Sequence, residues 1–304
     1  MAIAHSPLRY PGGKQVLTRV LSHLMKLNGV HGGTYAEPFA GGAGAAISLL
    51  FGEHVDRVLI NDADLCIYAF WNAALYHTER FLKLLRTTPT TVCEWERQRA
   101  IYQQPKRHST LRVGFATFYL NRCNRSGIIG NGGPIGGKRQ TGKWKIDARF
   151  NRKELERRIT RIALYRDRVS VSQMDGIEFL KRHVTTLDER AKAFVYLDPP
   201  YYAKGCDLYL NHYKPEDHAK LAAYLKNEVR FDWVLSYDNV PEIKRLYAGL
   251  RRVSFKLDYS ARERRVGSEI MILKSGLAFP DRWKRTIPQQ YVTASDNVSI
   301  PVAG

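Results

Sequence analysis

One stretch near the N-terminus constrains the fold more than any other, because it reads as a strand, a glycine-rich loop, a helix and a second strand that ends in an acid. The loop runs from Glu37 to Gly44 with the sequence EPFAGGAG, an Ala/Leu-rich helix follows to about Leu50, and the second strand covers 58–62. In open α/β sheets a ligand binds beyond the carboxyl ends of the strands, where glycines allow close approach and the next acid bonds ribose hydroxyls. The alternative is a glycine turn that serves only tight packing.

The same alternation continues along the chain. Strands are predicted at 169–172, 194–197, 233–236, 253–257 and 270–273, and helices after Lys14 and at 155–165, 177–183 and 215–225. Alternating strands and helices predict an α/β fold with a mostly parallel sheet. The stretch 87–152 breaks the pattern and is predicted to be an inserted domain. The expected division is 1–86 and 153–275 for the two parts of the core, 87–152 for the insertion and 276–304 for a tail.

The charge of the chain points to a polyanionic partner. The 304 residues carry a formal net charge of +19. Residues 97–168 hold 19 lysines and arginines against four acids, which gives +15 in that segment alone. A basic segment of this density indicates binding to nucleic acid.

Cysteine usage and hydropathy predict a cytoplasmic protein. The four cysteines occur without a CxxC pair or a histidine at metal-ligand spacing, so neither a zinc site nor a disulfide framework is predicted. The N-terminus lacks a secretory apolar segment, and no run of about 18 apolar residues occurs. We therefore expect no signal peptide, no membrane span and no metal.

The segment YLDPPYY, residues 196–202, ends a predicted strand in an unusual way. Pro199 and Pro200 cannot donate hydrogen bonds to a neighbouring strand, which leaves the Asp198 carboxylate and the carbonyls beside it free to face a ligand. Two acceptors suit the two N–H groups of an exocyclic amine, and Tyr201 offers a face on which a flat base can stack. The alternative is a Pro-Pro turn with a capping aspartate.

Four motifs in this order resemble the Dam-type adenine-specific DNA methyltransferases of the D12 class. They are RYPGGK at 9–14, EPFAGGAG at 37–44, Asn61-Asp62, and DPPY at 198–201, and the resemblance spans roughly 7–275. It implies a Rossmann-like S-adenosylmethionine-dependent methyltransferase core with an inserted, mainly helical target-recognition domain and a basic β-hairpin. The implied activity is methyl transfer to N6 of a flipped adenine in double-stranded DNA, with S-adenosylhomocysteine as the other product.

The resemblance also assigns roles. Asp198 and Pro199 would bind the target amino group, with Pro200 completing the motif and Tyr201 stacking on the base. The cofactor would be held by Tyr10, Lys14, Glu37, Phe39, Gly41, Asp62, Asp175 and Asp198. Alternatives for two of these are a solvated Lys14 at a helix start and a core position for Tyr10.

DNA contacts are expected from two basic elements. The segment 118–127 resembles the family's helix-to-loop reader, and the loop 260–267 resembles its DNA-gripping hairpin. The candidate residues are Asn121, Asn124, Arg125, Lys138, Arg139, Arg262, Arg264 and Arg265. For Lys138 and Arg139 the alternative is a face that contacts only phosphates, and for 260–267 it is a solvated hairpin tip. Residues 123–130 depart from the GATC-methylating members, so the resemblance assigns no recognition sequence.

Three other functions fit parts of the pattern. The acceptors and aromatic of DPPY would also suit cytosine N4 in DNA or adenine N6 in RNA, and a DNA-binding regulator could keep the pocket without turnover. A cognate restriction endonuclease is a further partner to consider.

Overall fold

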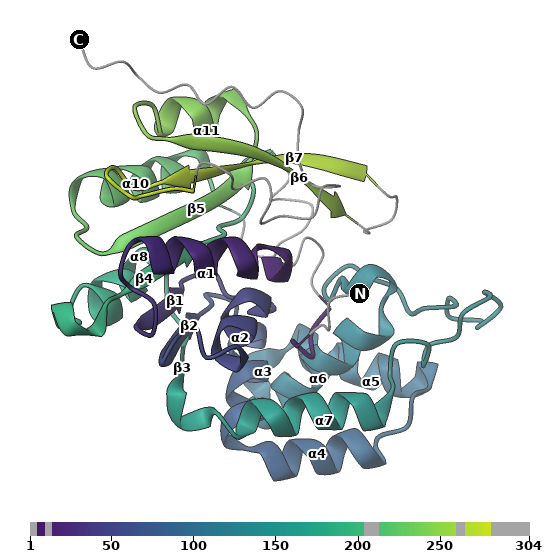
Figure 1. Ribbon diagram of the computed structural model, residues 1–304. Helices are drawn as coiled ribbons and strands as arrows, with labels where there is room; N and C mark the ends of the chain where they lie inside the picture. Colours follow the sequence, from purple (N-terminus) through teal and green to yellow (C-terminus); the bar gives the residue numbers. More distant parts are fainter. Residues whose placement is uncertain (1–4, 10–13, 204–212, 260–264, 281–304) are drawn as a thin grey trace.

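The computed structural model describes residues 5–9, 14–203, 213–259 and 265–280, with side chains for all of these except Gln15, 256–259 and 265–267. Its centre is a seven-stranded sheet of order β3-β2-β1-β4-β5-β7-β6 (Figure 1). The strands are β1 (Thr34–Glu37), β2 (Arg57–Asn61), β3 (Val169–Ser172), β4 (Phe194–Leu197), β5 (Asp232–Asp238), β6 (Arg252–Tyr259) and β7 (Arg265–Leu273). Strands β1 to β5 pair in parallel, and β7 is antiparallel to β5 and β6. This confirms the predicted α/β class and the mostly parallel sheet.

Both faces of the sheet are buried, because successive side chains of its central strands enter two different hydrophobic clusters. In β4, Phe194 and Tyr196 join one cluster while Val195 and Leu197 join the other. Strand side chains alternate between faces with a period of two, so a parallel strand covered on both sides is apolar throughout. The sheet is therefore the middle of three layers.

Helices cover both faces of the sheet. One face is covered by η1 (Lys14–Leu17), α1 (Thr18–Leu27), α2 (Gly44–Phe51) and α3 (Leu65–Tyr76). The other is covered by α8 (Gly176–Phe179), the π-helical turn that continues it (Leu180–Val184), α10 (Pro215–Asn227) and α11 (Pro241–Leu246). All of these helices except η1 and α1 come after a strand in the chain. The loops that connect strands to these helices line the carboxyl edge of the parallel strands.

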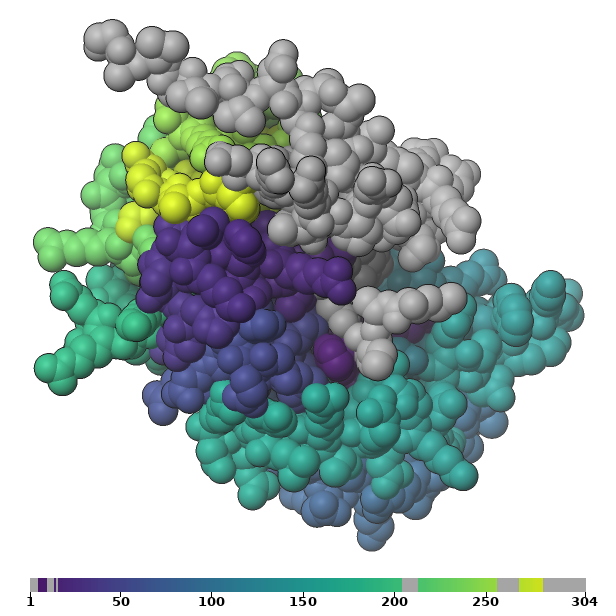
Figure 2. Space-filling view, in the orientation of Figure 1, coloured from purple at the N-terminus to yellow at the C-terminus, as the bar shows by residue number. Residues whose placement is uncertain are grey.

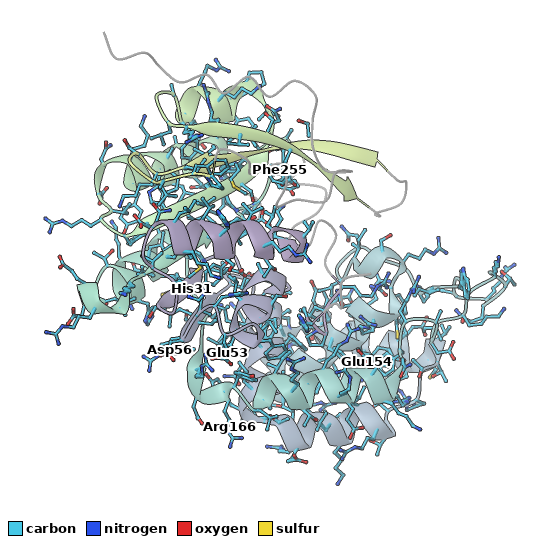
Figure 3. The ribbon with its side chains drawn as sticks, in the orientation of Figure 1. His31, Glu53, Asp56, Glu154, Arg166 and Phe255 are labelled. Atoms are coloured by element: carbon cyan, nitrogen blue, oxygen red, sulfur yellow. The ribbon has the colours of Figure 1, made fainter. Side chains whose placement is uncertain are left out.

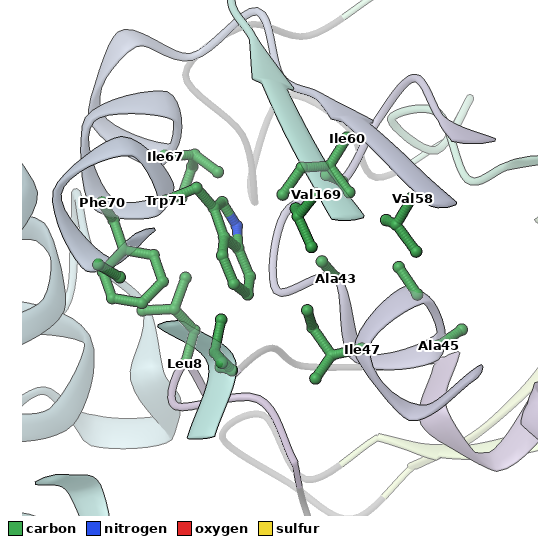
Figure 4. Packing of buried hydrophobic residues seen from close by; sticks show 14 of the residues in the cluster. Leu8, Ala43, Ala45, Ile47, Val58, Ile60, Ile67, Phe70, Trp71 and Val169 are labelled. Atoms are coloured by element: carbon green, nitrogen blue, oxygen red, sulfur yellow. The ribbon is translucent and has the colours of Figure 1, made fainter. Parts of the chain in front are cut away.

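Four more helices extend the first layer beyond the sheet. They are α4 (Thr78–Thr87), α5 (Val92–Gln103), α6 (Thr110–Cys123) and α7 (Arg152–Ala163), which occupy the lower right of Figure 1. Helices α4, α6 and α7 pack on α3, and α5 packs on α6. Their apolar side chains join those of the sheet in one continuous cluster: Phe118 of α6 stacks on Phe70 of α3 with ring centroids 6.0 Å apart. Trp71 lies between Phe70 and the sheet residues Ile60 and Val169 (Figure 4).

Helices α3 and α6 approach each other closely at a glycine. A Cβ added at Gly114 of α6 would lie 2.3 Å from the carbonyl oxygen of Ala69 in α3. No side chain fits at that distance, so Gly114 sets the separation of the two helices.

The observed elements agree with the sequence predictions at most positions. Strands β3 and β4 have the predicted bounds, whereas α7 begins at Arg152 because the side chain of Asn151 accepts from the Glu154 amide at 3.1 Å and caps the helix there. Helices α3 and α4 were not predicted. Helix α3 is buried on nearly all sides and so lacks the amphipathic stripe that marks a surface helix.

Residues 277–279, near the end of the described chain, pack against the rest of the protein. Within the tail predicted at 276–304, Ala278 exchanges hydrogen bonds of 2.8 and 3.0 Å with the side chain of Asn28 after α1, and Phe279 is buried. No helix in the described ranges is long and apolar enough to cross a membrane.

Candidate functional site

Four acidic residues gather at the carboxyl edge of the parallel strands. Glu37 ends β1, Asp62 follows β2, Asp175 lies beyond β3, and Asp198 follows β4. Strand β1 pairs with both β2 and β4, so the chain reverses its direction of winding between β1 and β4. In open α/β sheets ligands bind at such a switch point. The fold thus brings together acids that lie up to 161 positions apart in the sequence.

Glu37 is a buried carboxylate at this switch point. Its Oε1 accepts hydrogen bonds from the Tyr35 hydroxyl at 2.9 Å and from the Ala46 amide at 3.0 Å. Burial raises the pKa of Glu37 to about 8, although these two bonds act to lower it. Because the Ala46 amide belongs to the first turn of α2, Glu37 ties the end of β1 to the helix that follows the glycine loop.

The glycine loop is fixed from both sides at Gly41. Its amide donates to Asp62 Oδ2 at 2.9 Å, and its carbonyl accepts from the Trp71 indole at 2.9 Å. Ala43, which caps α2, has the left-handed backbone of φ 43° that is rare for a residue with a side chain. Burial raises the pKa of Asp62 to about 7, against the bonds from the Asp64 and Gly41 amides. Two hydrogen bonds at Gly41 thus tie the loop to Asp62 and to α3.

Asp175 and Phe39 both contact the side chain of Tyr213. Asp175 caps α8 by accepting from the amides of Ile177 and Glu178 at 2.9 and 3.2 Å. The Tyr213 hydroxyl bonds Asp175, and its ring meets that of Phe39 edge-on at 5.7 Å. These groups form the part of the edge that lies beyond β3.

Lys14 joins the N-terminal motif to the DPPY motif. Its Nζ lies 3.1 Å from Asp198 Oδ1 and 3.1 Å from Glu269 Oε1, and it donates to the Tyr201 hydroxyl at 2.9 Å. Burial acts to lower the pKa of Lys14, but the two carboxylates hold it well above its usual value. Lys14 is 6 % exposed. It is therefore a buried cation of the site, and the solvated alternative is wrong.

A second set of bonds fixes Asp198 and the backbone after Tyr201. Asp198 Oδ1 accepts from Ser236 Oγ at 2.8 Å, and Ser236 bonds the Tyr196 hydroxyl at 2.7 Å. Asp238, at the end of β5, accepts from the amides of Tyr202 and Ala203 at 3.0 and 2.9 Å. The carboxylate and the loop that carries it are thus held by neighbouring strands. The sequence analysis did not single out Ser236, Asp238 or Glu269.

The predicted base readers Asn121 and Asn124 are both buried and internally bonded. Asn121 pairs with the backbone of Arg9, accepting from its amide at 2.7 Å and donating to its carbonyl at 2.7 Å. Asn124 accepts from the Trp95 indole at 2.6 Å and donates to the carbonyls of Ile128 and Ile129. In this structure both amides organise the loop after α6 and the segment that precedes the Gly-Gly-Lys motif.

Replacing Asn124 by alanine is therefore expected to destabilise the protein. The buried Trp95 indole and two part-buried carbonyls would lose their partner, which corresponds to a loss of about 2–4 kcal/mol in the free energy of unfolding. Urea unfolding measures it, with Asn72→Ala as control because, among the described residues, that amide bonds the Tyr68 hydroxyl alone, at 3.3 Å. An unchanged stability with an altered base preference would show instead that Asn124 acts on DNA.

The remaining predicted DNA contacts fall into two groups. Arg125, Lys138 and Arg139 are exposed on the segment between α6 and α7, which projects from the body at the right of Figures 1 and 2. Lys138 forms an exposed ion pair with Glu96 at 3.1 Å. Tyr10, Arg262 and Arg264 lie outside the described residues, as does the side chain of Arg265.

A cluster of arginines lies beside α6. Arg122 donates to the carbonyl of Arg149 at 2.8 Å, and Arg158 donates to the carbonyl of Ser6 at 3.2 Å. Burial lowers the pKa of Arg122 to about 9, with the charges of Arg9, Arg158 and Arg149 acting in the same direction. Glu154 of α7, which is labelled in Figure 3, pairs with Arg158 at 2.7 Å. Guanidinium groups that repel one another in this way gain from a bound anion.

No metal cluster accompanies these groups in the described part of the chain, where no three His, Cys, Asp or Glu side chains are placed to hold an ion. The site combines the four acids at the carboxyl edge with Glu269, the buried Lys14 and Tyr201. Such a set suits a ligand with cationic groups and sugar hydroxyls, together with a second ligand that donates hydrogen bonds to Asp198.

The sequence matches the model of the D12 class N6 adenine-specific DNA methyltransferases over residues 10–261. No protein of curated function matches it. Similar solved structures include a conserved hypothetical protein of Streptococcus pyogenes (12 % identity, TM-score 0.34, 85 % of this chain and 98 % of that one). Another is the rRNA methyltransferase AviRa of Streptomyces viridochromogenes (13 % identity, TM-score 0.33, 85 % of this chain and 81 % of that one). A third is a protein of Legionella pneumophila (12 % identity, TM-score 0.35, 91 % of each chain). At these TM-scores the three likenesses add nothing to the family match.

Proposed function

The chain belongs to the D12 class N6 adenine-specific DNA methyltransferase family, and from this premise we propose that it methylates one adenine of a specific double-stranded site after flipping that base into the pocket beside Asp198. Membership makes it an enzyme that uses S-adenosylmethionine to methylate adenine N6 in DNA. The seven-stranded mixed sheet is typical of such methyltransferases. The observation that carries the proposal is the bonded group of Lys14, Asp198 and Tyr201 at the switch point.

The residues at the carboxyl edge fit S-adenosylmethionine. When bound, the cofactor supplies the methyl group of its cationic sulfonium. Asp62 is proposed to accept from the ribose hydroxyls, while Glu37 and the loop at Gly41 hold the methionine part. Phe39 and Asp175 are proposed to hold the adenine, which requires Tyr213 to yield its place between them. Tyr10 and Lys14 would close the site from the N-terminal side.

Asp198 and Pro199 are proposed to accept the two protons of the target amino group. The lone pair of an adenine N6 is delocalised into the ring, so acceptors that draw on both protons favour a pyramidal nitrogen that can attack. Both donors that the described residues offer to Asp198 reach Oδ1, and 27 % of the side chain is exposed. The carboxylate thus remains accessible to the target amine.

Tyr201 is proposed to stack on the flipped base. Its hydroxyl is held by Lys14 and Glu269, so the ring has a fixed orientation at the end of the DPPY motif. Stacking on an aromatic ring offsets part of the cost of unpairing a base. Lys14 lies 5.3 Å from the centre of this ring and neutralises part of the acidic charge around it.

The segment 87–152 is proposed to be the target-recognition domain, and the hairpin of β6 and β7 to grip the DNA backbone. Support comes from the exposed positions of Arg125, Lys138 and Arg139 on the projecting segment, and from the antiparallel pairing of β6 with β7 as far as Tyr259 and Arg265. The arginine cluster beside α6 extends this basic surface toward the N-terminal motif.

Removing Arg149 is expected to weaken DNA binding in a salt-dependent way. Its side chain is exposed, and Arg122 bonds only its backbone carbonyl, so alanine leaves the fold intact. The slope of log K against log salt concentration should fall by about 1, the value for one lost phosphate contact. Fluorescence anisotropy at several salt concentrations measures it, with Lys226→Ala on α10 as control. Equal slopes for Arg149→Ala and the wild type would remove Arg149 from the DNA surface.

Mapping of modified bases tests the function. Plasmid DNA from a methylation-deficient bacterium that expresses the chain would be sequenced at single-molecule resolution, and N6-methyladenine is expected at one short motif. Methylation of cytosine N4 alone, or of RNA alone, would contradict the proposal, and soluble protein that binds DNA and cofactor without turnover would indicate a regulator. A cytoplasmic location follows from the DNA substrate, and a cognate restriction endonuclease is proposed as partner if that motif matches one in the same genome.

A further inference from the structure

Glu269 is a buried carboxylate of the site that belongs to none of the four sequence motifs. It lies on β7 opposite Asp238 of β5 and Phe255 of β6, and it is 1 % exposed. Its Oε1 accepts from Lys14 Nζ at 3.1 Å and from the Tyr201 hydroxyl. Its Oε2 is buried and has no hydrogen-bond partner among the described residues.

This arrangement costs stability. One lysine faces two carboxylates, because Lys14 also lies 3.1 Å from Asp198. Burying a carboxylate with an unsatisfied oxygen lowers the free energy of unfolding, and an apolar residue of similar volume at that position would make the protein more stable. Such a group calls for a specific explanation.

The contacts of Glu269 explain why a carboxylate occupies this position. It bonds two groups from different parts of the chain, Lys14 of η1 and Tyr201 of the DPPY motif, and both of these bond each other at 2.9 Å. Strand β7 is central in its half of the sheet, paired on both sides, so its backbone gives Glu269 a rigid base. The strand thus fixes two side chains of the site through one carboxylate oxygen.

We propose that Glu269 is a positioning residue: its Oε1 holds the Tyr201 hydroxyl and Lys14 Nζ so that the Tyr201 ring and the Asp198 carboxylate face the target adenine together. This inference rests on the roles proposed for Asp198 and Tyr201. Glu269 itself acts through these residues.

Glu269→Gln tests the inference with little change in shape. Glutamine keeps an oxygen that can accept one bond, but it loses the charge that binds Lys14, so the Tyr201 ring and Asp198 are no longer fixed together. A misplacement of about 1 Å can lower turnover on the order of 100-fold. We expect kcat to fall by about 10- to 100-fold, while the Kd for S-adenosylmethionine, the KM for DNA and the melting temperature change little.

A double-mutant cycle separates positioning from a general structural effect. If Glu269 acts through the Tyr201 hydroxyl, Glu269→Gln should lower kcat much less in a Tyr201→Phe background than in the wild type, because coupled residues are not additive. Fluorescence of 2-aminopurine at the target position gives a second readout, since stacking on Tyr201 quenches it and Glu269→Gln should weaken that quenching. Asp232→Asn is the matched control, because Asp232 pairs with Lys274 at 3.2 Å at the other end of β5 and β7.

Three results of the Glu269→Gln measurements would overturn the inference. A wild-type kcat in Glu269→Gln, or a loss equal in both backgrounds, would overturn the inference. A loss of kcat that follows a matching loss of thermal stability would also overturn it. If the wild type methylated no adenine, the proposed function itself would fail, whereas full turnover in Asp198→Asn would remove only the role of Asp198. These failures can therefore be told apart from a failure of the Glu269 inference.

Discussion

Replacing Asp198 by asparagine is expected to lower kcat on the order of 1,000-fold, with cofactor and DNA binding largely kept. Asparagine has nearly the same shape as aspartate. Its side-chain oxygen can still accept from Ser236 Oγ, which donates to Asp198 Oδ1 at 2.8 Å in the wild type. Its amide, however, presents N–H groups where the target amine also presents N–H groups. The acceptor that activates N6 is thereby replaced by a donor.

Methyl transfer from labelled S-adenosylmethionine to duplex DNA measures this effect, and calorimetry with the cofactor shows whether the site stays intact. The exposed Asp188, which caps a short turn by accepting from the Arg190 amide, offers a control as Asp188→Asn. Turnover of Asp198→Asn within a few-fold of the wild type would mean that another group accepts the amino protons.

Lys14→Met should destabilise the protein strongly and in a pH-dependent way. Methionine preserves most of the volume but leaves Asp198 and Glu269 without the cation that lies 3.1 Å from each. Removing one partner of a buried charge pair costs about 3–5 kcal/mol. Burial already raises the pKa of Glu269 to about 7 in the presence of Lys14, and loss of the lysine raises it further.

The raised pKa of Glu269 determines how the stability loss of Lys14→Met depends on pH. A carboxyl whose pKa is higher in the folded than in the unfolded chain binds protons on folding, so its folded state gains stability as the pH falls. The deficit of Lys14→Met should therefore be largest near pH 8 and shrink toward pH 5. Urea unfolding at both pH values measures it, and Lys274→Met, which breaks a partly exposed pair, should cost less than about 1 kcal/mol. A deficit independent of pH would contradict the account.

Local patterns predicted the strands and the acids that end them, because both depend on neighbouring residues. The apolar run of β4 stops at Leu197, where two prolines and a carboxylate follow, and this is visible in seven letters of sequence. The family motifs then placed Lys14 and Asp198 in one site, and the structure brings these two charges to 3.1 Å.

Glu269 and the asparagines show what local patterns miss. Glu269 precedes the predicted strand 270–273, and its position in the pocket depends on the pairing of β7 with β5, which sequence spacing does not reveal. A single acid at the start of an apolar run was the available signal. Asn121 has the residue type of a base reader, yet its partner is the backbone of Arg9, 112 positions away. Residue type alone does not distinguish a group that reads DNA from one that holds a loop.

The close approach of α6 to α3 at Gly114 limits which sequences could replace the proposed target-recognition segment of this protein. Because the helices around α6 share one hydrophobic cluster with the sheet, a chimera that exchanged 87–152 as a block would bring new side chains against α3 and misfit at Ala69. Exposed positions of the segment between α6 and α7, such as Arg125, Lys138 and Arg139, are free of that constraint, whereas Ile146 and Phe150 of the same segment belong to the cluster. If the segment reads the target as proposed, new specificities should arise by stepwise substitution at its exposed positions while the supporting helices stay unchanged, and laboratory evolution would succeed there before it succeeds by domain shuffling.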